Sequence, residues 1–271
     1  MQFGLERMHK LMTALGIPQR RFASIHVVGT NGKSSTVRFT AALLERRGLR
    51  TGSYTSPHLG SFTERIEVGE KPVAGPAFEE AVARVRGAAE LVDRASEQPV
   101  TQFEALTAAA FHEFARAGAQ VAVIEAGLGG RHDATNVIPS SVQVLTGVAL
   151  EHTRWLGTSL AGIAEEKLAV VRDHGCLVTP PGLAPEVEAV AARVAAEHSA
   201  ERYGAGEDLG LELRARGRFQ RGNFALAVTA AQSFLARAGL PPLKPDEIIA
   251  AARRTEIPGR LQVVDTDPLT L

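Results

Sequence analysis

The sequence predicts an α/β protein built on a doubly wound, mainly parallel β-sheet. Short apolar, β-branched runs alternate with longer stretches of helical periodicity along most of the chain. One run, residues 25–28, leads through a glycine-bounded loop into a helical pattern. Another, residues 121–124, is apolar throughout, as expected of a strand whose two faces are both covered. Parallel strands joined in this way need right-handed crossovers, so helices are expected on both faces of the sheet.

The individual elements follow in a regular order. Strands are expected where a short apolar run is bounded by glycine or turn residues, at 25–28, 51–55, 121–124, 142–148 and 176–178. Helices are expected where apolar residues recur every three or four positions, at 5–15, 37–47, 78–95, 103–117, 160–171 and 185–198.

Three later stretches depart from this alternation. Residues 209–216 are expected to form an edge strand, and residues 223–238 and Pro245–Arg254 to form helices. Residues 261–264 have the pattern of a strand that enters a new element. We therefore expect one ATP-binding domain over residues 1–262, with residues 263–271 as the start of a linker.

Composition narrows the class of protein. Hydrophobic residues make up 45% of the 271 residues and charged residues 22%, as in ordinary soluble globular proteins. Lys+Arg and Asp+Glu are both 30, so the net charge of zero argues against bulk binding to nucleic acid or an anionic membrane.

No segment of the sequence suggests export or membrane insertion. The charged residues Glu6, Arg7, His9 and Lys10 rule out a secretory apolar region at the N-terminus, and no apolar run approaches the roughly 20 residues of a membrane span. The single cysteine, Cys176, is expected to be a small buried side chain in a strand. We expect a cytoplasmic monomer.

The loop after the first long strand carries the first functional signal. It reads Gly29-Thr30-Asn31-Gly32-Lys33-Ser34-Ser35 and is a shortened variant of the strict phosphate-loop pattern, because Val27 stands where the first glycine belongs. Backbone N–H groups and a helix N-terminus directed at one point suit a polyphosphate. Lys33 adds a charge beside the outer phosphates, and Ser34 or Ser35 can reach a magnesium ion. The alternative is a purely structural glycine turn.

Three further residues follow the ends of strands. Ser56, Glu125 and His152 come after the strands at 51–55, 121–124 and 142–148, and the carboxyl ends of parallel strands face the ligand crevice. A carboxylate at the end of a buried strand is costly unless it is paired or bound to a metal, so Glu125 is a candidate magnesium ligand.

Each of these residues also has a structural interpretation. Glu125 could be paired with a core arginine, Ser56 could belong to a simple Ser-Pro turn, and His152 could be an ordinary core or surface histidine. Lys167 reads on its own as part of a solvated helix face with intrahelical ion pairs.

Together these stretches resemble the Mur-ligase superfamily and, within it, the folylpolyglutamate synthase/dihydrofolate synthase family. The matching residues run in family order over nearly the whole chain. They are Gly29-Thr30-Asn31-Gly32-Lys33, Ser56-Pro57-His58-Leu59, Glu64-Arg65-Ile66, Phe103-Glu104 with Thr107, Glu125-Ala126-Gly127-Leu128-Gly129-Gly130-Arg131, Asp133-Ala134-Thr135-Asn136, His152-Thr153 with Leu156-Gly157, Glu166-Lys167, Gln220 with Asn223, and Pro258-Gly259-Arg260. The stretch that ends in Asp-Ala-Thr-Asn is specific to the folate branch.

The resemblance implies a phosphate-loop NTPase-like fold, that of the Mur-ligase central domain, and an ATP-dependent amide ligase. Such an enzyme phosphorylates a carboxylate of a pteroate or folate, and the amine of L-glutamate attacks the acyl phosphate. Catalysis then depends mainly on positioning and on stabilising negative charge. The implied cofactors are ATP and Mg²⁺, with a second Mg²⁺ supported by a carbamylated Lys167.

By the same resemblance, residues fall into four groups. The catalytic residues are Lys33, Lys167 and His152, and the metal ligands are Ser56, Glu125 and His152. The ATP-binding residues are Gly29, Thr30, Asn31, Gly32, Lys33, Ser34, Ser35, Asn223 and Arg260. The pterin site has Thr101, Phe103, Asp133 and Ala134, with Phe103 stacked on the ring.

Two alternatives stay open at this point. Ser34, at a position where the folate branch usually has glycine, favours a Mur-type ligase that acts on a cell-wall precursor. The family's carboxy-terminal glutamate-ligase domain has no counterpart before Leu271, so the chain is expected to turn over poorly by itself. A non-catalytic nucleotide- or folate-binding module is the second alternative.

Overall fold

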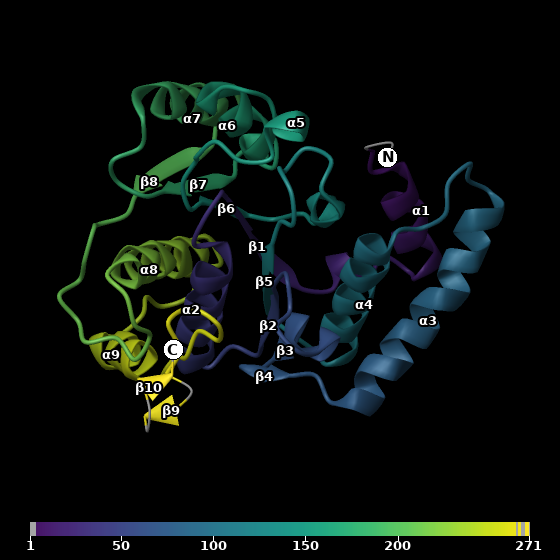
Figure 1. Cartoon of the computed structure of the whole chain (residues 1–271), viewed down its shortest axis with the longest axis horizontal. Coiled ribbons are helices and arrows are strands. Elements are labelled where there is room, and N and C mark those ends of the chain that lie inside the picture. The colour runs from purple at the N-terminus through teal and green to yellow at the C-terminus, as the bar shows by residue number, and fades with distance from the viewer. Residues whose placement is uncertain (1–3, 264, 267–268, 271) are drawn as a thin grey trace.

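The computed structural model describes residues 4–263, 265–266 and 269–270, and it confirms the expected α/β architecture. An eight-stranded sheet in the order β4-β3-β2-β5-β1-β6-β7-β8 has helices on both faces (Figure 1). Its strands are β1 (Ala23–Val28), β2 (Thr51–Tyr54), β3 (Ile66–Val68), β4 (Lys71–Pro72), β5 (Val121–Glu125), β6 (Val142–Leu145), β7 (Cys176–Thr179) and β8 (Glu201–Gly204).

Helices connect most of these strands. They are α1 (Glu6–Ala14), α2 (Lys33–Arg46), α3 (Gly75–Arg94), α4 (Gln102–Arg116), α5 (Thr153–Leu156), α6 (Leu160–Leu168), α7 (Pro185–Glu197), α8 (Phe219–Arg237) and α9 (Pro245–Arg254). A separate hairpin of β9 (Asp265–Thr266) and β10 (Leu269–Thr270) follows.

The sheet is parallel from β2 to β8 and antiparallel only at one edge. β1 lies at its centre and pairs in parallel with β5 and β6. β3 pairs antiparallel with both β2 and β4, because a hairpin rather than a helix joins β3 to β4. The carboxyl ends of β1, β2, β5 and β6 therefore meet at one edge, where open α/β sheets bind their ligands.

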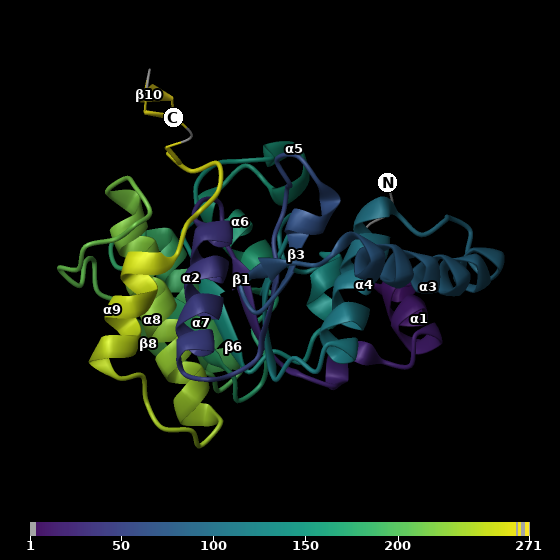
Figure 2. The ribbon, with the colours of Figure 1, turned by 90° about the horizontal axis from the view of Figure 1, so that it is seen from below.

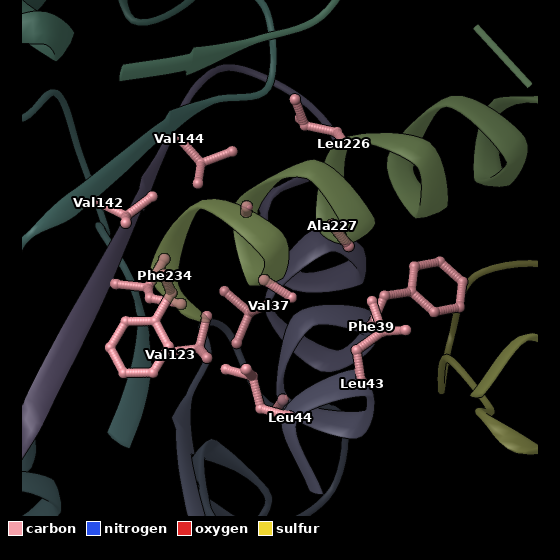
Figure 3. Close-up of a cluster of buried hydrophobic side chains, with 14 of the residues drawn as sticks. Val37, Phe39, Leu43, Leu44, Val123, Val142, Val144, Leu226, Ala227 and Phe234 are labelled. Carbon is pink, nitrogen blue, oxygen red and sulfur yellow. The ribbon is translucent and has the colours of Figure 1, made fainter. Parts of the chain in front are cut away.

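One face of the sheet is covered by α2 and α8. Figure 3 shows side chains of these helices against strand residues such as Val123 and Val142, in a cluster that is almost wholly buried. The rings of Phe39 and Phe224 meet edge-on, with centroids 5.1 Å apart. Because this packing anchors α2 along its length, the helix N-terminus at Lys33 is held rigidly beside the end of β1.

The opposite face has two further apolar clusters. One lies between the sheet and α1, α3 and α4, and the other lies under α6 and α7. Figure 2 shows α3 and α4 on the side away from α2, α8 and α9. Cys176 is buried in β7, as its apolar neighbours predicted.

The expected edge strand at 209–216 is wrong. The alternation there is real, since Leu211, Leu213 and Ala215 pack against the α2/α8 core. However, the backbone N–H of Arg214 donates to the carbonyl of Ala252 in α9, so the segment lies on a helix and not on a strand. The strand at the β7 side of the sheet's edge is β8, whose residues are largely exposed and give no apolar signal.

The expected strand at 261–264 is also wrong for its described part, because residues 261–263 are irregular and Leu261 has a φ of +55°. The expected linker 263–271 includes residues 264, 267, 268 and 271, which lie outside the described residues. Of the helices that the structure describes, none combines the length and apolarity of a membrane span.

Candidate functional site

The loop between β1 and α2 has the geometry of a phosphate-binding turn. Gly32 precedes α2 with a φ of +85°, a conformation that favours glycine. A Cβ atom at Gly32 would also lie 2.5 Å from Oδ1 of Asn223. The N–H of Thr30 donates to the carbonyl of Gly147 over 2.9 Å, which ties the loop to the segment after β6. The glycine pattern in the sequence thus reflects both backbone conformation and space.

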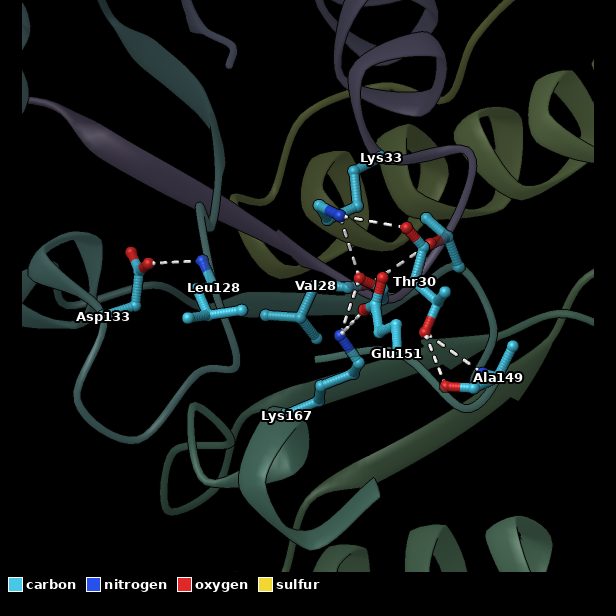
Figure 4. A network of polar contacts seen from close by, with 10 residues as sticks. Val28, Thr30, Lys33, Leu128, Asp133, Ala149, Glu151 and Lys167 are labelled. Carbon is cyan, nitrogen blue, oxygen red and sulfur yellow. Dashed lines mark hydrogen bonds and ion pairs between the residues drawn. The ribbon is translucent and has the colours of Figure 1, made fainter. Parts of the chain in front are cut away.

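Two lysines converge on this loop (Figure 4). Lys33 Nζ donates to the carbonyls of Gly29 and Thr30 over 3.0 and 3.1 Å. Lys167 Nζ donates to the same Gly29 carbonyl over 2.9 Å and to Glu151 Oε1 over 2.7 Å. The ammonium groups are therefore gathered around one carbonyl at the end of β1.

The interpretation of Lys167 as a solvated residue is wrong. Its residue exposure is only 1%, so α6 points this side chain inward toward the phosphate loop. Burial lowers the pKa of Lys167, although the hydrogen bond and charge of Glu151 oppose that shift. Burial also raises the pKa of Glu151, but the hydrogen bond and charge of Lys167 outweigh it and leave that pKa below its usual range.

Glu125 is a buried carboxylate at the end of β5. It is 2% exposed and accepts hydrogen bonds from the Ser34 hydroxyl over 3.1 Å and from the Ser56 N–H over 3.0 Å. Within the described part of the chain it forms no ion pair, so the alternative of pairing with a core arginine is wrong. Burial raises the pKa of Glu125 to about 7 against the opposing charge of Lys33.

A polar cavity of 670 Å³ brings most of the predicted nucleotide and metal residues together. Asn223 enters it from near the N-terminal end of α8, and Arg260 enters it from the segment after α9. Its lining comprises Thr30, Asn31, Gly32, Lys33, Ser34, Ser35, Ser56, Pro57, Glu125, Gly127, Thr146, Phe219, Asn223 and Arg260.

A second cavity, of 510 Å³, is more apolar and holds all four residues predicted for the pterin site. Thr101 caps α4, with its hydroxyl accepting from the N–H of Glu104, and Phe103 lies in the first turn of that helix. The lining comprises Gly4, Arg7, Thr101, Phe103, Glu104, Gly127, Leu128, His132, Asp133, Ala134, Trp155, Leu156 and Glu166. An aromatic ring, apolar walls and a buried carboxylate suit a flat heterocycle with N–H donors.

Asp133 is held by donors on both of its oxygens. Leu128 N donates to Oδ2 over 2.8 Å, and the N–H and hydroxyl of Thr135 donate to Oδ1 over 3.0 and 2.5 Å. Burial raises the pKa of Asp133, and the hydrogen bonds from Thr135 and Leu128 oppose that shift. The loop beyond is anchored by Arg172, which donates to the carbonyl and the side-chain oxygen of Asn136 over 2.7 and 2.6 Å.

The two cavities meet at Gly127, which lines both of them. A Cβ atom at Gly127 would lie 2.6 Å from Cζ of Phe103 and 3.2 Å from Oδ2 of Asp133. Only glycine leaves space for these side chains beside the backbone. A ligand in the apolar cavity and one in the polar cavity are thus separated by a backbone without a side chain.

Two predicted residues are placed differently. Gly29 does not line the polar cavity, and its carbonyl instead holds the two lysines. His152 is exposed, lies at a φ of +44° just before α5, and does not share the cavity lining of Ser56 and Glu125. Among the described residues, no three His, Cys, Asp or Glu side chains are clustered as a metal site.

Some lining residues were not assigned from the sequence. Glu104, Leu128, Leu156 and Glu166 belong to the matching motifs, so a signal existed although no role was attached to it. Arg7, Trp155 and Phe219 reach the cavities from α1, α5 and α8, and no local pattern marks them. Such residues are found only once the elements are placed in space.

The arrangement suits transfer between two bound ligands. One cavity provides backbone N–H groups, a lysine and a metal-type carboxylate for a polyphosphate. The adjoining cavity provides an aromatic wall and a fixed acceptor for a heterocycle. Their shared wall lets a group of one ligand approach the terminal phosphate of the other.

Comparison with known proteins identifies relatives with this architecture. No protein-family model matches the chain. The chain is 36% identical over 288 aligned positions to the folylpolyglutamate synthase of Lacticaseibacillus casei, covering 97% of this chain and 67% of that one. It is 31% identical over 290 positions to the dihydrofolate synthase/folylpolyglutamate synthase of Bacillus subtilis, covering 98% and 67%.

The fold agrees with a solved structure described as an FPGS-AMPPCP-folate complex. The TM-score is 0.91 at 35% sequence identity, over 97% of this chain and 70% of that one. The chain thus spans about two thirds of the length of these relatives. On the strength of this identity and coverage, the chain belongs to the folylpolyglutamate synthase/dihydrofolate synthase family.

Proposed function

We propose that this protein is an ATP-dependent amide ligase that adds L-glutamate to dihydropteroate, to folate or to both. The observation that carries the proposal is the contact between the phosphate-loop cavity and the apolar cavity at Gly127. Relatives described as complexes with AMPPCP and folate support the two ligand classes. In the reaction, the γ-phosphoryl group passes from ATP to a carboxylate oxygen and ADP leaves. The glutamate nitrogen then attacks the carbonyl carbon, and phosphate leaves as the nitrogen loses a proton.

The nucleotide is assigned to the polar cavity. The N–H groups of the loop and the N-terminus of α2 face the phosphates, and Lys33 supplies a charge beside the outermost group. Asn223 and Arg260 also line this cavity and are assigned to the remainder of the nucleotide.

The chain's residues fit a magnesium ion in the same cavity. Glu125 is a buried carboxylate whose pKa is raised by burial, and the Ser56 backbone N–H already donates to it. Oxygen ligands of this kind are those that Mg²⁺ prefers. When bound, the ion neutralises charge on the phosphates. We assign Glu125 and the hydroxyl of Ser56 as ligands, and His152 stays a prediction as the third.

Lys167 fits the proposed carbamate. Its buried amine lies beside the loop carbonyl of Gly29, and its lowered pKa favours the neutral form that reacts with carbon dioxide. Carbamylation replaces a cation with an anion, which can support a second Mg²⁺. Bicarbonate-dependent activity that is lost in Lys167→Met tests this assignment.

The pterin ring is assigned to the apolar cavity. Phe103 forms one wall, while Thr101 and Ala134 lie on the lining beside it. Asp133 accepts from ring N–H groups. This placement directs the far carboxylate of a pteroate past Gly127 toward the phosphates.

We further propose that residues 1–262 are the ATP-binding unit and that residues 263–271 begin a linker to a glutamate-ligase domain. We also propose that the protein acts as a cytoplasmic monomer. Size-exclusion chromatography with light scattering tests the oligomeric state.

Phosphate release from ATP, measured on a chain that continues into the proposed glutamate-ligase domain, tests the function as a whole. We expect release to require both a dihydropteroate and L-glutamate. Turnover with a muramyl peptide in their place would contradict the folate assignment. Tight binding of AMPPCP and pteroate without any turnover would support a non-catalytic binding module.

A further inference from the structure

A buried histidine lies behind the carboxylate assigned to the pterin. His26 is in β1, the central strand, where its neighbours Ile25 and Val27 point into the α2/α8 core. Successive side chains of a strand point to opposite faces, so His26 points to the other side of the sheet. It is fully buried, and its pKa is lowered to about 3 by burial and by the charge of Arg172. It is therefore a neutral imidazole at physiological pH.

His26 contacts the hydroxyl of Thr135, which contacts Asp133. Nε2 of His26 lies 2.8 Å from Oγ1 of Thr135, and that hydroxyl lies 2.5 Å from Oδ1 of Asp133. Thr135 has no exposed surface, and Asp133 lines the apolar cavity. The chain of contacts thus runs from the centre of the sheet to the cavity wall.

The chemistry of the three groups fixes the direction of these hydrogen bonds. Backbone N–H groups of Leu128 and Thr135 donate to the two oxygens of Asp133, so both oxygens act as acceptors. The Thr135 hydroxyl donates its one proton to Oδ1 of Asp133, and its oxygen is left to accept from His26. A neutral histidine has one N–H, so that proton is on Nε2. Consistently, Nδ1 of His26 is a buried atom with no hydrogen-bond partner among the described residues.

We propose that His26 is a positioning residue that acts through Thr135 to orient the Asp133 carboxylate toward N–H donors of the ligand in the apolar cavity. This inference rests on the proposed function, in which that ligand is a pteroate or folate. His26 does not touch the ligand. It sets the Thr135 hydroxyl, which then has a single direction in which to donate, and this leaves the carboxylate in one rotamer.

The test compares variants that keep or remove a donor in the 271-residue chain. Thr135→Val removes the hydroxyl at similar size and Thr135→Ser keeps it, while His26→Leu removes the donor and His26→Gln restores one. Isothermal titration gives the Kd for pteroate and, separately, for AMPPCP, and thermal unfolding gives Tm. The matched control is Thr40→Val, since Thr40 is a buried residue of α2 whose hydroxyl donates to the Thr36 carbonyl over 2.7 Å.

We expect Thr135→Val and His26→Leu to weaken pteroate binding by about 10- to 100-fold, the loss expected for a hydrogen bond to a charged group. AMPPCP affinity is expected to stay within about twofold of wild type, and Thr135→Ser and His26→Gln to recover most of the pteroate affinity. When His26→Leu is combined with Thr135→Val, it should add no further loss of pteroate affinity, because its effect passes through Thr135. Thr40→Val should lower Tm and leave both affinities unchanged.

Different failures have different meanings. If wild type does not bind pteroate, the proposed function is wrong and the positioning role falls with it. If wild type binds pteroate and Thr135→Val or His26→Leu binds it equally well, the positioning role alone is wrong. Equal losses of pteroate and AMPPCP affinity that follow the fall in Tm, with no recovery in Thr135→Ser and His26→Gln, would show a merely structural role and also overturn the proposal.

Discussion

Substitution of Gly32 by alanine tests whether the phosphate loop depends on space as well as on backbone conformation. Gly32 has a φ of +85°, and a Cβ atom there would lie 2.5 Å from Oδ1 of Asn223. Gly48 offers a matched control, because its φ is +91° and a Cβ atom there would meet nothing within 4 Å. Gly48→Ala therefore measures the cost of the left-handed conformation alone.

The expected magnitudes follow from these contacts. A non-glycine residue in the left-handed region costs about 1–2 kcal/mol, which applies to both variants. In Gly32→Ala the Asn223 side chain must also move, which breaks its 3.0 Å hydrogen bond to Oε1 of the fully buried Gln220. An unsatisfied buried acceptor costs about 1–3 kcal/mol more. The total for Gly32→Ala is about 2–5 kcal/mol, or a fall in Tm of at least about 4 °C for a domain of this size.

Denaturant unfolding and titration with AMPPCP provide the measurements. Gly32→Ala is expected to lose more stability than Gly48→Ala and to bind AMPPCP at least about tenfold more weakly, since Asn223 is displaced within the polar cavity. Gly48→Ala should bind AMPPCP as wild type does. Equal losses of stability in the two variants, together with unchanged AMPPCP affinity in Gly32→Ala, would refute the argument from Asn223.

Three further predictions concern the buried charges and the apolar cavity. The pKa of Glu125 is about 7 and lies above its ordinary 4.5, so the folded state binds that proton more tightly than the unfolded state. Without Mg²⁺, the free energy of unfolding should therefore fall by on the order of 3 kcal/mol as the pH rises from about 4.5 to 7. Urea titrations at several pH values measure this slope, and Glu125→Gln should remove it. Arg172→Met should cost about 2 kcal/mol by releasing Asn136, whereas the exposed Arg193→Met should cost less than about 1 kcal/mol; equal Tm values for the two would contradict the anchoring role. Phe103→Ala should weaken pteroate binding by roughly tenfold with AMPPCP affinity unchanged, and an unaltered pteroate Kd would place the ring elsewhere.

Much of the fold was predictable because the central strands are both apolar and bounded by glycines. The wrong predictions occur where an apolar pattern, or its absence, has a physical cause other than the one assumed. Residues 209–216 alternate because one side packs on α8 and α9, yet sequence alone does not show whether a strand or a helix partners the backbone. β8 is an exposed edge strand, so burial does not enforce an apolar pattern on it. The hairpin of β3 and β4 is too short to show periodicity.

In the site too, some residues could be placed from the strand pattern and others could not. The places of Lys33, Ser56 and Glu125 in the polar cavity were predictable because each lies at or just after the end of a strand at the ligand edge. Only the family motif pointed to the place of Lys167 beside the phosphate loop, because its surrounding helix carries charges that suggest a solvated face. Arg7 comes from the N-terminal helix, and its place in the apolar cavity depends on how α1 packs against α3 and α4.

Because the two cavities share Gly127, the site can select ligands by their length. Under the proposed function, the ring of a ligand is held at Phe103 and Asp133, while the phosphates are held by the loop before α2. Whether a ligand reacts then depends on the length between its ring and its carboxylate, because only the correct length reaches past Gly127. A shorter analogue with the same ring fills the apolar cavity but stops before the phosphates. Recognition of the ring and selection for reaction are therefore made at two separate places, and competitive inhibitors need only satisfy the first.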